Sequence, residues 1–149
     1  MKSFTTTVLV LFLFLSAGFA QKTGDPKKKL FADFPNTVEI SKQTLKNLFT
    51  AIPGQKVNVP FNEKFIFKGQ VMSNEVKYAN LQSMIVRSEN SGGTLFQLSK
   101  IINKDNSVSY TGRIINPDAL EVFEIKNDMA DNYSLQKISL DKILQDCSY

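Results

Sequence analysis

The stretch that decides the fold is Leu81–Ile102, LQSMIVRSENSGGTLFQLSKII. Its two outer parts, residues 81–88 and 94–102, are rich in aliphatic, aromatic and β-branched side chains, a composition typical of strands. The polar segment Glu89–Gly93 between them has the length of a hairpin loop, and its two glycines can adopt the positive φ angles that tight hairpins require. The stretch therefore predicts two neighbouring antiparallel strands.

The next run, Ser107–Ile115, alternates between apolar and polar side chains, as a strand with one buried face does. One side carries Val108, Tyr110, Gly112 and Ile114, and the other carries Ser109, Thr111 and Arg113. The glycine marks a bulge, a bend or a close approach of another backbone. The run predicts a half-buried antiparallel strand.

Shorter runs of strand type lie at residues 37–40, 57–59, 65–72, 121–126 and 133–138. A helix is predicted to begin after Ser41, which is a good N-cap residue. Its apolar stripe has helical spacing and consists of Leu45, Leu48, Phe49 and Ile52. Pro53-Gly54 is expected to stop the helix.

Together these segments predict an α+β fold that is mainly antiparallel β. We expect about seven short strands in one sheet or a partly open barrel, one N-terminal helix, and a short C-terminal helical turn after Ser139. Periodicity does not decide between an open sheet and a closed barrel.

The N-terminus has the three parts of a secretory leader: Lys2, the apolar run VLVLFLFL at residues 8–15, and small residues before a cut after Ala20. The apolar run is shorter than the roughly 20 residues that a membrane-spanning helix needs. We therefore predict a signal peptide at 1–20, a flexible polar and basic linker at 21–35, and a single β-rich domain at 36–149. The protein would be exported to the periplasm or the extracellular space, without a stable membrane anchor after cleavage.

The charge balance favours no polyanionic partner. The formal net charge is +4, and removal of the leader would take away one basic residue and no acidic one. Lys27–Lys29 forms a basic run in the linker, but lysines and acids alternate through the rest of the chain. A nucleic-acid site would combine a basic face with exposed aromatic residues, so we predict no nucleic-acid partner.

The sequence excludes several chemistries, because it contains no histidine and one cysteine. Neither a Ser-His-Asp nor a Cys-His arrangement can be built, and the usual zinc ligands are missing. We predict no catalytic, cofactor-binding or metal-binding residues, and no enzyme activity. A glycan hydrolase that uses only carboxylates stays open, although Glu121 and Glu124 are expected to be solvated on opposite faces. The oxygen-rich loop Asn127–Asn132 is explained by turn chemistry without calcium.

Cys147 is the single cysteine of the chain. An odd cysteine in an exported protein can pair between molecules, whereas small free thiols are commonly buried and inert. The protein is therefore expected to be a monomer with a buried thiol or a dimer linked through Cys147.

Two arginines are the first candidates for a binding surface. Arg87 and Arg113 lie on predicted strands, and arginine is enriched among binding anchors. If their strands pair, the guanidinium groups could share a face with Tyr78 or Tyr110 and hold a carboxylate or an aromatic group. The alternative is an ordinary exposed cross-strand charge, paired with Glu89 or Glu121.

Four stretches carry a resemblance to a known group of proteins: residues 73–82, 85–88, 112–114 and 144–147. From Val38 onward, the chain resembles small exported proteins of bacteria of the Bacteroidota type. The resemblance implies a bacterial, periplasmic or extracellular setting, and it implies no activity.

These observations lead to one hypothesis and one alternative. The hypothesis is a secreted or periplasmic, non-catalytic binding or interaction module for an unknown protein or glycan. The alternative is an inhibitor or accessory subunit of an exported hydrolase, which would use a protruding loop such as Glu89–Gly93 to block a cleft.

Overall fold

The computed structural model describes residues 31–140 apart from positions 62 and 64. These residues form one helix and eight strands: β1 (Thr37–Ile40), α2 (Lys42–Leu48), β2 (Lys56–Pro60), β3 (Ile66–Tyr78), β4 (Leu81–Ser88), β5 (Leu95–Ile102), β6 (Val108–Ile115), β7 (Glu121–Asn127) and β8 (Tyr133–Ser139). The predicted signal peptide, most of the predicted linker, most of the predicted C-terminal helical turn, and Cys147 fall outside the described residues.

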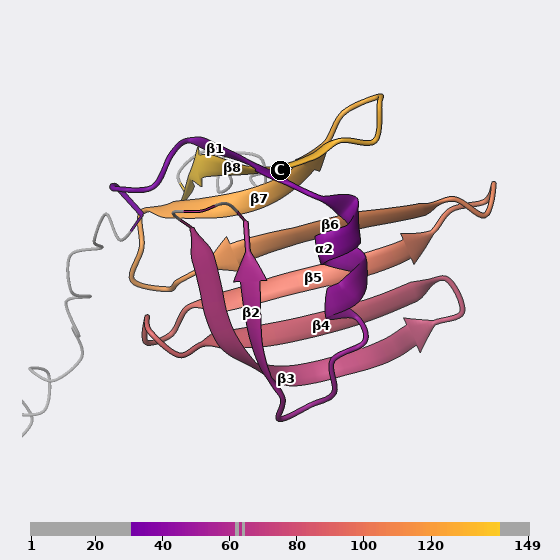
Figure 1. The fold of residues 1–149 in the computed structure, drawn as a ribbon, viewed down its shortest axis with the longest axis horizontal. Helices are drawn as coiled ribbons and strands as arrows, with labels where there is room; N and C mark the ends of the chain where they lie inside the picture. Colours follow the sequence, from indigo (N-terminus) through magenta and orange to yellow (C-terminus); the bar gives the residue numbers. More distant parts are fainter. Residues whose placement is uncertain (1–30, 62, 64, 141–149) are drawn as a thin grey trace, which may run out of the picture.

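All eight strands belong to one sheet in the order β1-β8-β7-β6-β5-β4-β3-β2, with every neighbouring pair antiparallel. The predicted fold class is confirmed. The sheet curls into a half-barrel whose free edges are β1 and β2, so it is open. Figure 1 shows α2 crossing the concave face in front of β4, β5 and β6, with β2 and the bent first half of β3 beside it. Pro60 lies on the edge strand β2, where its missing N–H is tolerated.

Aromatic side chains fill the concave side next to α2. The buried or partly buried members of this phenylalanine cluster are Phe31, Phe34, Phe61, Phe65, Phe67, Phe96 and Phe123. The ring centroids of Phe31 and Phe123 are 5.4 Å apart, and those of Phe34 and Phe65 are 4.6 Å apart. Phe31 and Phe34 lie within the segment 21–35 that is predicted as a linker. The apolar pair belongs to the core.

The helix begins as predicted and ends earlier. The Ser41 hydroxyl accepts a hydrogen bond from the Thr44 N–H at 3.0 Å, which makes Ser41 the N-cap, and Leu45 and Leu48 are buried. Ile52, however, is 67% exposed, so its assignment to the buried stripe is wrong. The helix has ended at Leu48, and helical spacing no longer applies four residues later.

The side chain of Asn74 on β3 attaches the end of the helix to the sheet. Its amide nitrogen donates to the backbone carbonyls of Phe49 and Ala51 at 2.9 and 2.8 Å. Its amide oxygen accepts a hydrogen bond from the Gln82 side chain at 2.9 Å. Carbonyls at a helix C-terminus have no partner within the helix. Here the inward-facing Asn74 side chain satisfies the carbonyl of the C-cap residue Phe49 and that of Ala51, two residues beyond it.

Strand β3 is longer than the predicted 65–72 run, and the register against β4 shifts between Val71 and Ser73 and again between Val76 and Tyr78. A bulge moves the following residues to the other face of the strand. Asn74 therefore lies opposite the buried Met84, and Val76 lies opposite Gln82. The predicted hairpin between residues 88 and 94 is present, and of the two glycines in its loop, Gly92 and Gly93, only Gly93 has a positive φ angle, +77°.

Gly112 is a position of close backbone approach. An added Cβ would lie 2.4 Å from the Gln97 carbonyl oxygen and 3.2 Å from the Leu98 Cα. Both atoms belong to the backbone of β5, which cannot yield without disturbing the sheet.

Gly112→Ala is expected to lower the free energy of unfolding by about 1–3 kcal/mol, the usual cost of overpacking. Urea unfolding followed by circular dichroism measures it. Thr111→Ala, on the exposed face one residue away, is the matched control and should change stability by less than about 0.5 kcal/mol. Equal effects of the two changes would contradict a steric role for the glycine.

Candidate binding groove

A cavity of about 550 Å³ lies between α2 and the hairpin end of β5 and β6. We call it the lysine groove, and it is lined by Lys42, Gln43, Lys46, Lys100, Val108 and Tyr110. The first three come from one side of α2, where helical spacing places positions 42 and 46 one above the other. The other three come from the concave face of the sheet. Its size is typical of small-molecule sites.

The strand register builds the floor of the groove. Lys100 lies directly opposite Tyr110, and Ile102 lies directly opposite Val108. On the next strand, Gln82 lies opposite Lys100. Because every second residue of a strand points to the same face, the buried Phe96 and Leu98 place Lys100 on the inner face too.

A second, smaller hollow of about 160 Å³ adjoins the lysine groove and shares Lys100 with it. We call it the hairpin shelf, since it follows the β3–β4 turn, and it is lined by Val76, Tyr78, Ala79, Asn80, Leu81, Gln82, Lys100 and Ile102. Val76 and Tyr78 are 71% and 70% exposed, and Ile102 is 38% exposed. The groove thus continues onto an uncovered apolar surface.

Tyr110 is held rigidly by two aromatic neighbours. Its ring stacks on Phe49 at 5.9 Å between centroids and meets Tyr133 edge-on, also at 5.9 Å. The Tyr110 backbone N–H donates to the Tyr133 hydroxyl at 3.3 Å. Burial raises the pKa of the Tyr110 phenol, although the positive charge of Lys42 opposes this. The phenol is neutral at physiological pH, so Tyr110 supplies a fixed, uncharged surface.

The three lysines of the groove differ in their partners. Lys42 forms an ion pair with Asp131, whose hydrogen bond raises the pKa of the lysine ammonium. The pKa of Asp131 is in turn lowered, chiefly by its hydrogen bond with Lys42. Within the part of the chain that the structure describes, no ion pair includes Lys46 or Lys100. The groove therefore presents two positive charges that the described residues do not neutralise.

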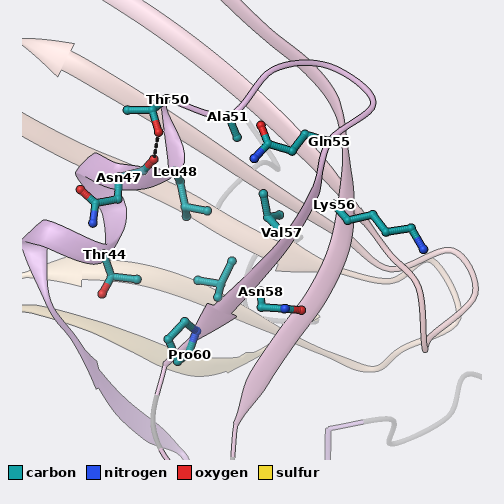
Figure 2. A pocket seen from close by; sticks show the side chains of 11 residues that line it. Thr44, Asn47, Leu48, Thr50, Ala51, Gln55, Lys56, Val57, Asn58 and Pro60 are labelled. Carbon is teal, nitrogen blue, oxygen red and sulfur yellow. Dashed lines mark hydrogen bonds between the residues drawn. The ribbon is translucent and has the colours of Figure 1, made fainter.

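A third hollow, a cleft of about 480 Å³, lies on the other side of the helix, between α2 and the edge strand β2 (Figure 2). Thr44, Asn47 and Thr50 line it from the helical side, and Asn58 lines it from the strand. Lys56 is its one charged lining residue, and it forms an ion pair with Glu89 at 2.9 Å. This cleft offers neutral hydrogen-bonding groups and no free charge.

The predicted surface of two arginines and two tyrosines is divided between the two faces of the sheet. Arg113 is three residues from the inward-facing Tyr110 and therefore points to the convex face. Its guanidinium donates to Glu124 on β7 from Nε at 3.1 Å and from Nη2 at 2.9 Å. Arg87 follows the buried Val86, is exposed on the convex face, and is in no ion pair among the described residues. Tyr110 lines the lysine groove on the concave face, and Tyr78, at the β3–β4 turn, lines the hairpin shelf.

The two acids Glu121 and Glu124 are both partly buried. Glu124 receives ion pairs from Arg113 and Lys126, and its side chain is 15% exposed, so the prediction that it is solvated is wrong. Burial raises its pKa, but the hydrogen bonds from Lys126 and Arg113 outweigh burial and hold the pKa below its ordinary value. Glu121 is also partly buried, and its Oε2 is buried without a hydrogen-bond partner in the described structure.

The Asn127–Asn132 loop is organised by its own backbone. One oxygen of the Asp128 carboxylate accepts hydrogen bonds from the N–H groups of Ala130 and Asn132, both at 2.9 Å. Asp131 faces Lys42 instead. Among residues 31–140 without positions 62 and 64, no group of three or more acidic, histidine or cysteine residues is placed to hold a metal ion.

No protein-family model, curated protein or solved structure matches this chain. In the described region, no helix is long and apolar enough to cross a membrane.

Sequence reasoning missed the lysines of the groove. A signal was present, because Lys100 follows Phe96 and Leu98 at the same spacing of two and therefore occupies an inward position of a strand. Lysine is rarely placed inward without a reason. Lys42 and Lys46, four residues apart on one helix, were the second signal.

The ion pairs of Glu124 predict a pH dependence. A carboxylate whose pKa is lowered by folding stabilises the protein above its unfolded pKa and loses that contribution as pH falls through the folded value. Glu124→Gln should therefore be less stable than the wild type at pH 7, by about 1 kcal/mol. The difference should shrink as pH falls below the ordinary value of 4.5. Urea unfolding at a series of pH values checks this.

Glu75→Gln provides the control for that experiment. Glu75 and Lys77 form an exposed pair within β3, so its loss should cost less than about 0.5 kcal/mol. A stability difference for Glu124→Gln that stays constant from neutral to acid pH would argue against the ion pairs as its cause.

Proposed function

We propose that this chain is an exported, non-catalytic binding protein that holds a small ligand in the lysine groove. The observation that carries the proposal is a pair of lysines, Lys46 on α2 and Lys100 on β5, that line one cavity beside Val108 and Tyr110 and form no ion pair with any described residue. Ligand sites combine a mainly apolar wall with a few polar groups that converge on it, and this groove has both.

The chemistry of the groove supports binding without turnover. Its lining contains lysines, one glutamine, one valine and one buried tyrosine, and it contains no carboxylate. General acid–base catalysis needs a group whose pKa lies near the working pH and that reaches the reacting atom. The chain has no histidine to fill that role.

The proposed location rests on the leader-like residues 1–20 and on the resemblance to exported proteins of the Bacteroidota type. An envelope or extracellular binding protein of this kind would meet its ligand outside the cytoplasm. Its fold needs no disulfide, since the phenylalanine cluster supplies an ordinary hydrophobic core.

One observation favours a second candidate, the inhibitor or accessory subunit. The exposed Glu89–Gly93 loop is fixed by Asn116, whose buried amide donates to the Gly92 carbonyl at 2.9 Å and to the Thr94 hydroxyl at 2.8 Å. A preformed loop loses little conformational entropy on binding. If this candidate is correct, replacing residues 89–93 by a shorter turn abolishes binding to a hydrolase, and changes in the groove do not.

Retention of the natural ligand tests the first candidate. The protein is purified after export from its own cell, and bound small molecules are extracted and identified by mass spectrometry. The wild type should carry a ligand that is recovered chemically unchanged. Lys100→Glu should carry less than about a tenth as much, since reversing a charge in contact with the ligand costs more than the 1.4 kcal/mol that corresponds to tenfold.

Lys68→Glu is the matched control, because Lys68 is an exposed lysine on β3 and changes the net charge equally. It should retain the ligand as the wild type does. Equal loss in both variants, or recovery of a processed product, would count against a binding site in the groove.

A further inference from the structure

We infer that the ligand of the lysine groove is a small amphipathic anion, with one acidic group on an aliphatic body. The inference rests on the proposed function and names its ligand class. It follows from the placement of cations beside uncovered aliphatic side chains.

The charge of the groove has one sign. Neither the lysine groove nor the hairpin shelf has an aspartate or glutamate among its lining residues. Asp131 neutralises Lys42 from outside this lining, and Lys46 and Lys100 have no acidic partner in the described part of the chain. An anion placed between α2 and β5 would contact two cations from separate elements. A cationic ligand would be repelled.

The surface beside these cations is aliphatic. Val108 and Ile102 form a cross-strand pair next to Lys100, and Val76 lies on the same face two strands away. Val76 and Ile102 are exposed in the free protein. A strongly hydrophilic anion would leave this surface in water, whereas an aliphatic body would cover it and gain the hydrophobic contribution.

Because the cations of the groove are lysines, they select weakly among different acidic groups. An ammonium is a compact charge without the planar fork of arginine, so it does not distinguish a carboxylate from a sulfate or a phosphate by geometry. The two arginines of the described region point to the opposite face of the sheet. Selection therefore depends on negative charge together with apolar length.

The volumes fit a small molecule. The lysine groove measures about 550 Å³ and the hairpin shelf about 160 Å³, and Lys100 lies where they meet. A ligand with its acidic group between Lys46 and Lys100 can extend its aliphatic body over Val108 and Ile102 toward Val76.

Isothermal titration calorimetry with the purified protein tests the inference. The probes are decanoate, decyl sulfate, decyltrimethylammonium, decyl maltoside and butyrate, each below its micelle concentration, with folding monitored by circular dichroism. Decanoate and decyl sulfate should bind one to one. Butyrate should bind at least about tenfold more weakly, because it lacks several buried methylenes. Decyltrimethylammonium should give no saturable heat.

Variants locate the binding. Lys46→Ala/Lys100→Ala should weaken decanoate binding at least about tenfold, the effect of losing charge-assisted contacts. Lys68→Ala/Arg87→Ala removes two exposed cations on the opposite face of the sheet and should change affinity less than about twofold. Amide shifts in an NMR titration should be largest around Ile102, Val108 and Lys100.

The outcomes separate the inference from the proposed function. If decyl maltoside or the cation binds as tightly as decanoate, and the groove variant abolishes that binding, the ligand class is overturned and the function stands. The ligand class is also overturned, and the function still stands, if no probe binds while the protein retains a natural ligand that is not an amphipathic acid. If no probe binds and nothing is retained, both are overturned. Equal weakening by the two double variants overturns the inference, because the loss then follows net charge alone.

Discussion

The structure depends on covering the inner face of an open, curled sheet. Strands of eight residues are about 26 Å long, at roughly 3.3 Å per residue. The helix that covers them crosses the strands, so it covers a band about as wide as its own diameter, roughly 10 Å. The phenylalanine cluster fills the concave face on one side of that band. On the other side, among the residues that the structure describes, the hairpin ends of β3 to β6 extend past α2 with nothing packed over them (Figure 1). The groove is what a short helix leaves uncovered.

The position of the helix is fixed at both ends by polar contacts as well as by apolar packing. At its end, Asn74 satisfies two backbone carbonyls and is itself held by Gln82. At its start, Lys42 is paired with Asp131 in the β7–β8 loop. Between them, Leu45 and Leu48 are buried against the sheet. Because α2 forms one wall of the groove, these contacts also fix the distance between Lys46 on the helix and Lys100 on the sheet.

Local sequence patterns correctly predicted features that depend on residues close in the chain, such as strand alternation and helix capping. They did not predict side-chain positions that depend on the register between strands. The alternation at residues 107–115 correctly placed Val108, Tyr110 and Ile114 on the buried side, and Ser41 capped the helix as expected. The bulges of β3 could not be predicted, because an extra residue in one strand is defined only against its partner. Without them Asn74 and Val76 could not be placed on the inner face. The prediction that Ile52 is buried was wrong for a related reason. Apolar residues at helical spacing do not show where the helix ends.

In the candidate site, too, residue type could be read from the sequence, whereas the neighbours of each residue depend on the register between strands. Arginine is a common anchor, and this made Arg113 attractive from sequence alone, but the register of β6 against β7 places Glu124 opposite it. A side-chain cation that is already paired with a carboxylate of the same protein attracts an anionic ligand only weakly. Arg113 is paired in this way, and it shares the Glu124 carboxylate with Lys126. The register of β5 against β6 has the opposite consequence, because it places an uncharged tyrosine opposite Lys100. Which cation can bind an anion is therefore decided by what the neighbouring strand presents across from it. That property belongs to the sheet and cannot be read from one strand.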